Sequence, residues 1–154
     1  MLARILFSVS ALAMCFFCIP ALFADENKDD AKLVQGNWKV VALEADGKQA
    51  PDEALKGMRW SFKGNELQGT DPGEKPSDKA SFKLDSSKSP KQIDLVVLEG
   101  AQKGKTIEGI YKFEKVRLIV CLRGPEAAEK GRPQEFKTEA DSGLGMITLE
   151  RIKE

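Results

Sequence analysis

The most informative absence in this 154-residue chain is histidine, of which there is none. Without an imidazole, the chain has no Ser-His-Asp or Cys-His catalytic arrangement and lacks the commonest zinc ligand. Its glycine spacing matches no phosphate-binding loop. Catalysis would have to depend on carboxylates, lysine or tyrosine. We therefore expect a protein that is not an enzyme and that has no metal site and no cofactor.

Cysteine is scarce as well. Two of the three cysteines, Cys15 and Cys18, lie in the apolar N-terminal segment, so removal of that segment would leave Cys121 alone, without an internal disulfide partner. We interpret Cys121 as a small apolar residue of a strand. An intermolecular disulfide and a reactive thiol are the alternatives. A chain of this length can bury a core without disulfides.

An excess of charge of either sign is also absent, because 24 Lys and Arg residues balance 24 Asp and Glu residues. Nucleic acids and anionic membrane surfaces both select for partners with an excess of Lys and Arg. The composition therefore argues against nucleic acid, and against an anionic membrane surface, as a main partner.

The N-terminus carries an apolar run that is typical of a signal peptide. Arg4 precedes an apolar segment at 5–19, and Pro20 leads to the small residue Ala24 before an acidic stretch. This pattern predicts a signal peptide at 1–24 and export to the periplasm or the extracellular space. An uncleaved membrane anchor is the alternative, which the short run and Pro20 disfavour. After cleavage we expect no membrane span.

The segment after the predicted leader is charged and has no large apolar residues up to Lys32. This composition predicts a flexible spacer at 25–32, followed by one domain at 33–154. A lipoprotein anchor at Cys15 is a weaker possibility, because the bulky Met14 stands where a small residue is required.

Long helical periodicity is missing from the predicted domain. Pro51 to Gly57 predicts one short helix, with Pro at its first position, acids in its first turn and Gly at its end. Elsewhere apolar and polar residues alternate, most clearly at 58–63, where Met58, Trp60 and Phe62 share one face. About eight strands are predicted, at 33–43, 58–63, 66–68, 80–85, 92–99, 107–113, 116–123 and 146–152, with a further short candidate at 134–137. Hairpins in sequence order predict an all-β antiparallel meander that closes into a barrel.

Two residues predict how the barrel closes. Trp38 lies in the first strand within Gly36-Asn37-Trp38, and Arg151 lies in the last strand on the same face as the apolar Leu149. First and last strands are neighbours in a closed barrel, so the guanidinium can stack on the indole ring. This Gly-x-Trp with a late Arg resembles the signature of lipocalins.

A wider resemblance covers nearly all of the chain after the leader. Its motifs are Leu-x-Gln-Gly-x-Trp-Lys-Val-Val at 33–41, Lys-Ser-Pro-Lys-Gln-Ile-Asp-Leu at 88–95, Gly-Ile-Tyr at 109–111 and Arg-Pro-Gln-Glu-Phe at 132–136. In these the chain resembles the uncharacterised lipocalin-like domain of planctomycete bacteria. The resemblance implies a lipocalin-like barrel and export, and it supplies no catalytic residue. The turn at 114–116 departs from the family, where Gly or Asp is expected.

Function is predicted from the barrel interior. Seven large inward candidates could line a site for a small apolar ligand: Trp60, Phe62, Phe82, Leu95, Tyr111, Phe113 and Leu118. The alternative is that they fill the interior and that the domain serves protein–protein interaction or a structural role in the cell envelope. The outward apolar residues that motivate this alternative are Val96, Leu98, Ile110 and Ile119. Asp94 and Glu108 form the best carboxylate pair for acid–base chemistry, but both face away from the predicted core.

Overall fold

Eight antiparallel strands form a closed barrel in the computed structural model, which describes residues 26–73 and 75–153. The helices are α1 (Glu26–Leu33), α2 (Asp52–Leu55) and the 3-10 helix η1 (Pro125–Lys130). The strands are β1 (Gly36–Ala45), β2 (Lys48–Gln49), β3 (Arg59–Lys63), β4 (Glu66–Asp71), β5 (Lys75–Asp85), β6 (Gln92–Val97), β7 (Thr106–Glu114), β8 (Arg117–Arg123) and β9 (Leu144–Arg151). The predicted leader at 1–24 lies outside the described residues.

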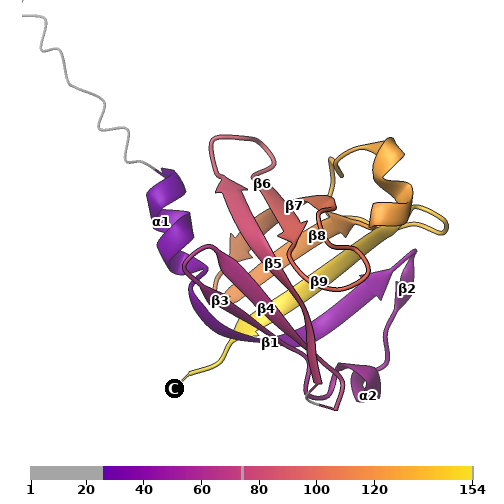
Figure 1. Ribbon diagram of the computed structural model, residues 1–154, viewed down its shortest axis with the longest axis horizontal. Helices are drawn as coiled ribbons and strands as arrows, with labels where there is room; N and C mark the ends of the chain where they lie inside the picture. Colours follow the sequence, from indigo (N-terminus) through magenta and orange to yellow (C-terminus); the bar gives the residue numbers. More distant parts are fainter. Residues whose placement is uncertain (1–25, 74, 154) are drawn as a thin grey trace, which may run out of the picture.

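The strands follow one another around the barrel in sequence order (Figure 1). β1 pairs with both β3 and β9, which removes the free edges that an open sheet would expose. The two-residue strand β2 pairs only with the end of β1 and stands outside the ring. The predicted all-β antiparallel meander of about eight strands that closes into a barrel is confirmed.

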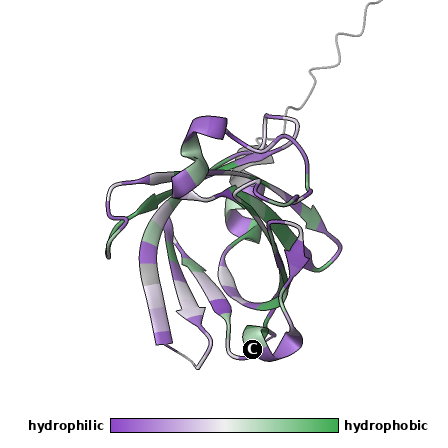
Figure 2. Cartoon of the chain, turned by 90° about the vertical axis from the view of Figure 1, so that its right-hand side faces the viewer, coloured by the Kyte–Doolittle hydropathy of each residue, from purple (hydrophilic) through white to green (hydrophobic). Residues whose placement is uncertain are grey.

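The core lies inside the barrel, because each strand turns one apolar face inward. Hydrophilic and hydrophobic residues alternate along several strands, as Figure 2 shows. The largest fully buried side chains of the interior include Phe62, Tyr111, Leu118 and Leu149. The short helix predicted at 51–57 is present as α2, whose Leu55 contributes to this core.

Helix α1 corrects the prediction of a flexible spacer at 25–32. Asp30 and Val34 lie four residues apart and are both buried, at 5 % and 1 % exposure. The Asp30 carboxylate accepts hydrogen bonds from Tyr111 Oη at 2.6 Å and from Lys91 Nζ at 2.9 Å. The indole Nε1 of Trp38 donates to the carbonyl of Val34 at 2.7 Å. These tertiary contacts order a segment whose composition alone does not favour packing.

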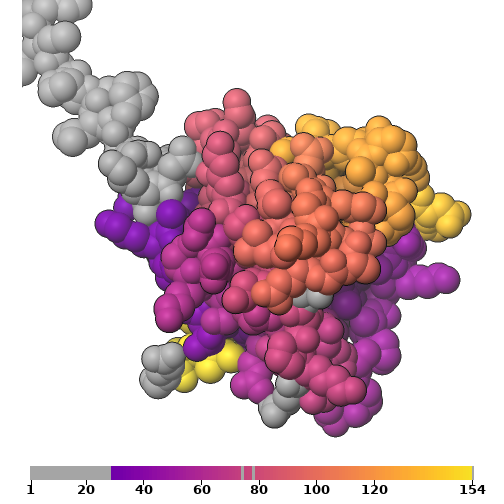
Figure 3. Space-filling view, in the orientation of Figure 1, coloured from indigo at the N-terminus to yellow at the C-terminus, as the bar shows by residue number. Residues whose placement is uncertain are grey.

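The connection between β8 and β9, residues 124–143, packs on the outer face of the barrel, where Arg132 donates to the carbonyls of Ile93 and Gly109. Figure 3 shows this segment at the upper right of the molecule. Lys112 on β7 lies 4.6 Å from the centre of the Phe136 ring in this connection. Beneath it Ile110 and Cys121 are paired across β7 and β8 and are 1 % and 0 % exposed, although they face away from the interior. The short strand predicted at 134–137 is wrong, because this segment packs as irregular chain over the sheet.

The segment at 69–79 has the Gly and Pro content that predicts a loop, but it is strand over most of its length. β4 and β5 continue their pairing there, and Thr70 lies opposite Pro76. A register shift between Gln68 and Thr70 accommodates the proline-containing segment.

Candidate functional site

The two ends of the barrel differ, and β7 runs from one to the other. We call the end that carries α1 and the β7–β8 turn the closed end. The open end carries the β6–β7 loop at 98–105 and the 124–143 connection. A hollow lies at each end, and we call them the closed-end groove and the open-end pocket.

The contact predicted between Trp38 and Arg151 is present at the closed end. These residues pair across β1 and β9, and the guanidinium carbon lies 4.3 Å from the centre of the indole ring. Arg151 also donates from Nη1 to the carbonyl of Gln35 at 2.6 Å and from Nη2 to the carbonyl of Leu33. The carbonyl of Leu33 ends α1 and that of Gln35 lies in the link to β1, so one side chain covers the tryptophan and satisfies acceptors where the helix ends.

Gly36 of the Gly-x-Trp motif is required by this geometry. Its φ angle is +106°, which L residues with a side chain rarely adopt. A Cβ atom at this position would lie 3.0 Å from Arg151 Nη1. Glycine therefore lets the chain turn from α1 into β1 and leaves room for the guanidinium.

The interior next to the closed end is filled with aromatic rings. Phe62 and Phe82 meet edge to face with ring centres 5.1 Å apart, and Tyr111 and Phe113 do so at 6.0 Å. Trp38 adds a tilted contact with Phe113 at 6.4 Å. This half of the barrel therefore has a packed core.

The seven residues predicted as a ligand-binding interior all belong to the core or pack against it. Phe62, Leu95, Tyr111 and Leu118 are buried, and Trp60, Phe82 and Phe113 are partly buried. They divide into different sites. Trp60 and Leu95 line the open-end pocket, Phe113 lines the closed-end groove, and the other four line neither hollow.

The open-end pocket has a volume of about 540 Å³. Its apolar lining comes from strands around the barrel and from the first residue of η1: Trp60, Leu67, Pro76, Ala80, Leu95, Val97, Ile107, Leu122 and Pro125. Its remaining lining residues are Gly69, Asp71, Ser77, Lys79 and Gln102. A cavity with a mainly apolar wall and a few polar groups has the character of a small-molecule site.

Small residues keep this pocket open. Ala80 of β5 lines it where a larger side chain would occupy the space, and Gly69 of β4 leaves room for the Ser77 side chain in the wall. At Gly69 a Cβ atom would lie only 2.1 Å from Ser77 Oγ, so the serine hydroxyl lies directly over the glycine backbone. Ala80 is 8 % exposed and pairs with Val97 of the neighbouring strand β6.

Gln102 supplies a polar group whose hydrogen-bonding capacity is unused. Within residues 26–73 and 75–153, its Oε1 is the buried side-chain oxygen or nitrogen that has no hydrogen-bond partner. A buried acceptor without a donor is unfavourable by about 1–3 kcal/mol, and a donor from a bound molecule would remove that cost. Sequence reasoning missed Gln102, since a glutamine in a Gly- and Lys-rich loop carries no signal of this kind.

The predicted carboxylate pair, Asp94 and Glu108, is held away from both hollows. The two residues lie opposite each other on β6 and β7 and share Arg132, whose Nη2 is 2.6 Å from Asp94 Oδ1 and 3.0 Å from Glu108 Oε1. The Arg132 side chain is only 13 % exposed and also donates to the carbonyls of Ile93 and Gly109. This cluster fastens the 124–143 connection to the outer face of the sheet.

Cys121 lies under the same connection. Burial raises the pKa of its thiol above the ordinary value, although the backbone N–H of Lys137 donates to the sulfur. Among the described residues, no group of three or more Cys, Asp or Glu side chains is arranged to hold a metal ion. The described helices are all too short or too polar to span a bilayer.

Comparison with known proteins adds no relative: no family model, no curated protein and no solved structure matches the chain. The site must therefore be interpreted from its own geometry.

Proposed function

We propose that this protein is an exported, non-catalytic binding module of the lipocalin-like type, and that it holds a small, largely apolar molecule in the open-end pocket. The observation that carries the proposal is the combination of an apolar wall with the unpartnered Gln102 Oε1. The wall favours an apolar body, and the oxygen favours a ligand that presents one N–H or O–H donor.

The dimensions of the pocket support a small ligand. Its volume of about 540 Å³ falls within the range of roughly 300–1,000 Å³ that is usual for small-molecule sites. Leu67, Leu95 and Val97 are buried and present their apolar groups along it. A ligand in contact with them would exchange water for apolar surface, which drives binding.

Native mass spectrometry of the protein purified from its own source tests the proposal. We expect a small molecule to remain bound and to be released on denaturation. Ala80→Leu adds a side chain inside the pocket and should abolish the bound mass. Ala128→Leu makes the same change on the exposed side of η1 and should retain it. Absence of any bound molecule, or equal occupancy in both variants, would contradict the proposal.

A second candidate is a structural or protein-interaction domain of the cell envelope. The aromatic packing next to the closed end favours it, because much of the interior is already filled by side chains. Its sequence motivation is weaker, since Ile110 is buried beneath the 124–143 connection and Val96, Leu98 and Ile119 are at most partly exposed. An empty protein that co-purifies with a stoichiometric envelope partner would favour this candidate.

Export and the lipocalin-like family belong to the same proposal. Their support is the N-terminal apolar pattern and the Gly36, Trp38 and Arg151 arrangement at the closed end. N-terminal sequencing of the protein from the periplasmic and extracellular fractions tests export. We expect the mature chain to begin at Asp25. An intact residue 1 in a membrane fraction would instead indicate an anchor.

A further inference from the structure

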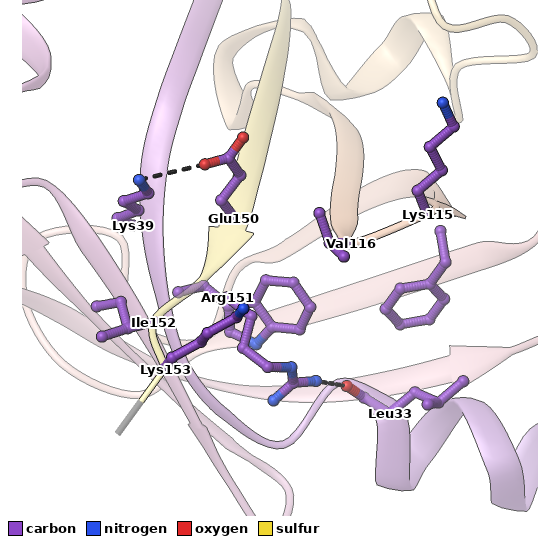
Figure 4. Close-up of a pocket in the computed structure, with 10 residues that line it drawn as sticks. Leu33, Lys39, Lys115, Val116, Glu150, Arg151, Ile152 and Lys153 are labelled. Carbon is purple, nitrogen blue, oxygen red and sulfur yellow. Dashed lines mark hydrogen bonds and ion pairs between the residues drawn. The ribbon is translucent and has the colours of Figure 1, made fainter.

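The closed-end groove gathers the exposed large apolar side chains of the described residues. These are Leu33 and Val116, which are 51 % and 69 % exposed. Leu33 ends α1, and Val116 lies in the two-residue turn between β7 and β8, yet both line the same groove of about 710 Å³ (Figure 4). Trp38, Phe113 and Ile152 also line the groove. Two protruding apolar groups on one small face indicate contact with another apolar phase.

The charge of this face is strongly one-sided. Lys39, Lys115, Arg151 and Lys153 line the groove, and Glu150 is its one lining carboxylate. The complete chain has no excess of either sign, so the fold separates charges that balance overall. A face with this excess attracts anions, and it would repel a second copy of itself.

Two of these cations are available to an outside partner. Lys39 lies 3.2 Å from Glu150, and Arg151 is engaged with Trp38 and the end of α1. Within the described part of the chain, Lys115 and Lys153 form no ion pair. Lys115 stands next to Val116 in the turn, so a cation flanks the most exposed apolar side chain.

We propose that the closed end docks on the surface of an anionic lipid bilayer. Val116 and Leu33 enter the boundary between headgroups and acyl chains, and Lys115 and Lys153 contact the anionic headgroups. The apolar groups protrude from a turn and a helix end, which suits insertion into a bilayer better than enclosure of a soluble ligand. The near-zero charge of the whole chain argued against such a surface, but docking depends on the face that makes contact. In this orientation the open-end pocket points away from the membrane.

Vesicle sedimentation of the full chain tests this docking. The measured quantity is the ratio of partition coefficients on phosphatidylcholine vesicles with and without phosphatidylglycerol. Any binding through the apolar residues 5–19 occurs on both vesicle types and cancels in this ratio. We expect the ratio to be well above one at low salt and to fall as salt is added, because the attraction is screened.

Matched variants locate the contact. Lys115→Gln with Lys153→Gln should lower the ratio about 25-fold, at about fivefold for each cation. Lys103→Gln with Lys105→Gln removes the same charge from the exposed open-end loop and should leave the ratio nearly unchanged. Val116→Ser should weaken binding to the anionic vesicles about tenfold.

Three results would overturn the proposal. The first is a ratio near one, and the second is an equal fall of the ratio in both double variants. The third is a dimer in light scattering that Val116→Ser dissociates, which would assign the face to self-association. All substituted residues are exposed, and unchanged thermal unfolding of each variant would verify that the fold is retained.

Discussion

Replacement of Arg151 by alanine should destabilise the fold more than replacement of an ordinary surface arginine. The guanidinium of Arg151 stacks on Trp38 and donates to the carbonyls of Leu33 and Gln35, so a single truncation removes three interactions. It also removes the cover from an indole that is only 2 % exposed.

The magnitude follows from these contacts. A partly exposed cation–π contact contributes about 1 kcal/mol. The two hydrogen bonds lie near the surface, so together they add about another 1 kcal/mol. A loss of about 2 kcal/mol in the free energy of unfolding lowers the Tm of a domain of this size by about 8 °C. Arg151→Lys keeps the charge without the planar guanidinium, and its stability should fall between those of the parent and of Arg151→Ala.

Urea unfolding and calorimetry of Arg151→Ala provide the assay, with Arg117→Ala as the matched control. Arg117 also lies near the closed end, but its bonds to Glu150 form an exposed ion pair of about 0–1 kcal/mol. If the two variants lose equal stability, the closure attributed to Arg151 is wrong. Export of Arg151→Ala should be little changed, because the predicted leader at 1–24 is distant in sequence.

Three further variants probe the closed end. Gly36→Ala should lower stability by about 1–3 kcal/mol in urea unfolding, because its positive φ is strained for alanine and its Cβ would crowd Arg151; a neutral result would contradict this. Asp30→Ala and Tyr111→Phe should show a coupling of about 1–2 kcal/mol in a double-mutant cycle, whereas additive losses would show that α1 is not held by this bond. Hydrogen bonds from Arg117 and Lys39 lower the pKa of Glu150 in the folded protein. The stability that ionised Glu150 contributes is therefore present above its pKa in the unfolded chain and is lost as pH falls through its folded pKa. Glu150→Gln should therefore be less stable than the parent above about pH 4.5, with a difference that shrinks below it; a gap that is constant with pH would refute the assignment.

The barrel could be predicted because its signals are local and repeated. Alternation at Met58, Trp60 and Phe62 identifies a half-buried strand without knowledge of its partners. The pairing of Trp38 with Arg151 could also be predicted, since closure makes the first and last strands neighbours and strand parity gives the face of Arg151.

Other features depend on contacts between distant residues and could not be predicted in this way. Asp30 lies in a charged stretch and becomes buried only because Lys91 and Tyr111 supply donors. Gln102 becomes a candidate ligand-binding residue only because other strands form a pocket beside it. The aromatic residues could be placed inside the barrel, but which of them fill it and which line a pocket depends on the small residues opposite them.

The turn at 114–116 lacks the glycine or aspartate expected there, and the fold forms without it. Lys115 adopts a φ of +55°, where glycine or asparagine is preferred, and the hairpin still forms. The pairing of β7 with β8 over six residue pairs holds the turn in this conformation.

A fluorescence titration with the neutral apolar probe N-phenyl-1-naphthylamine tests directly whether the open-end pocket binds a ligand. The chain has two tryptophans, and Trp60 lines the open-end pocket whereas Trp38 lies at the closed end. In Trp38→Phe, which leaves Trp60 as the sole indole, we expect saturable quenching with one probe per chain, and adding Ala80→Leu should abolish it. Quenching that never saturates, or that persists unchanged with Ala80→Leu, would contradict a ligand site in the open-end pocket.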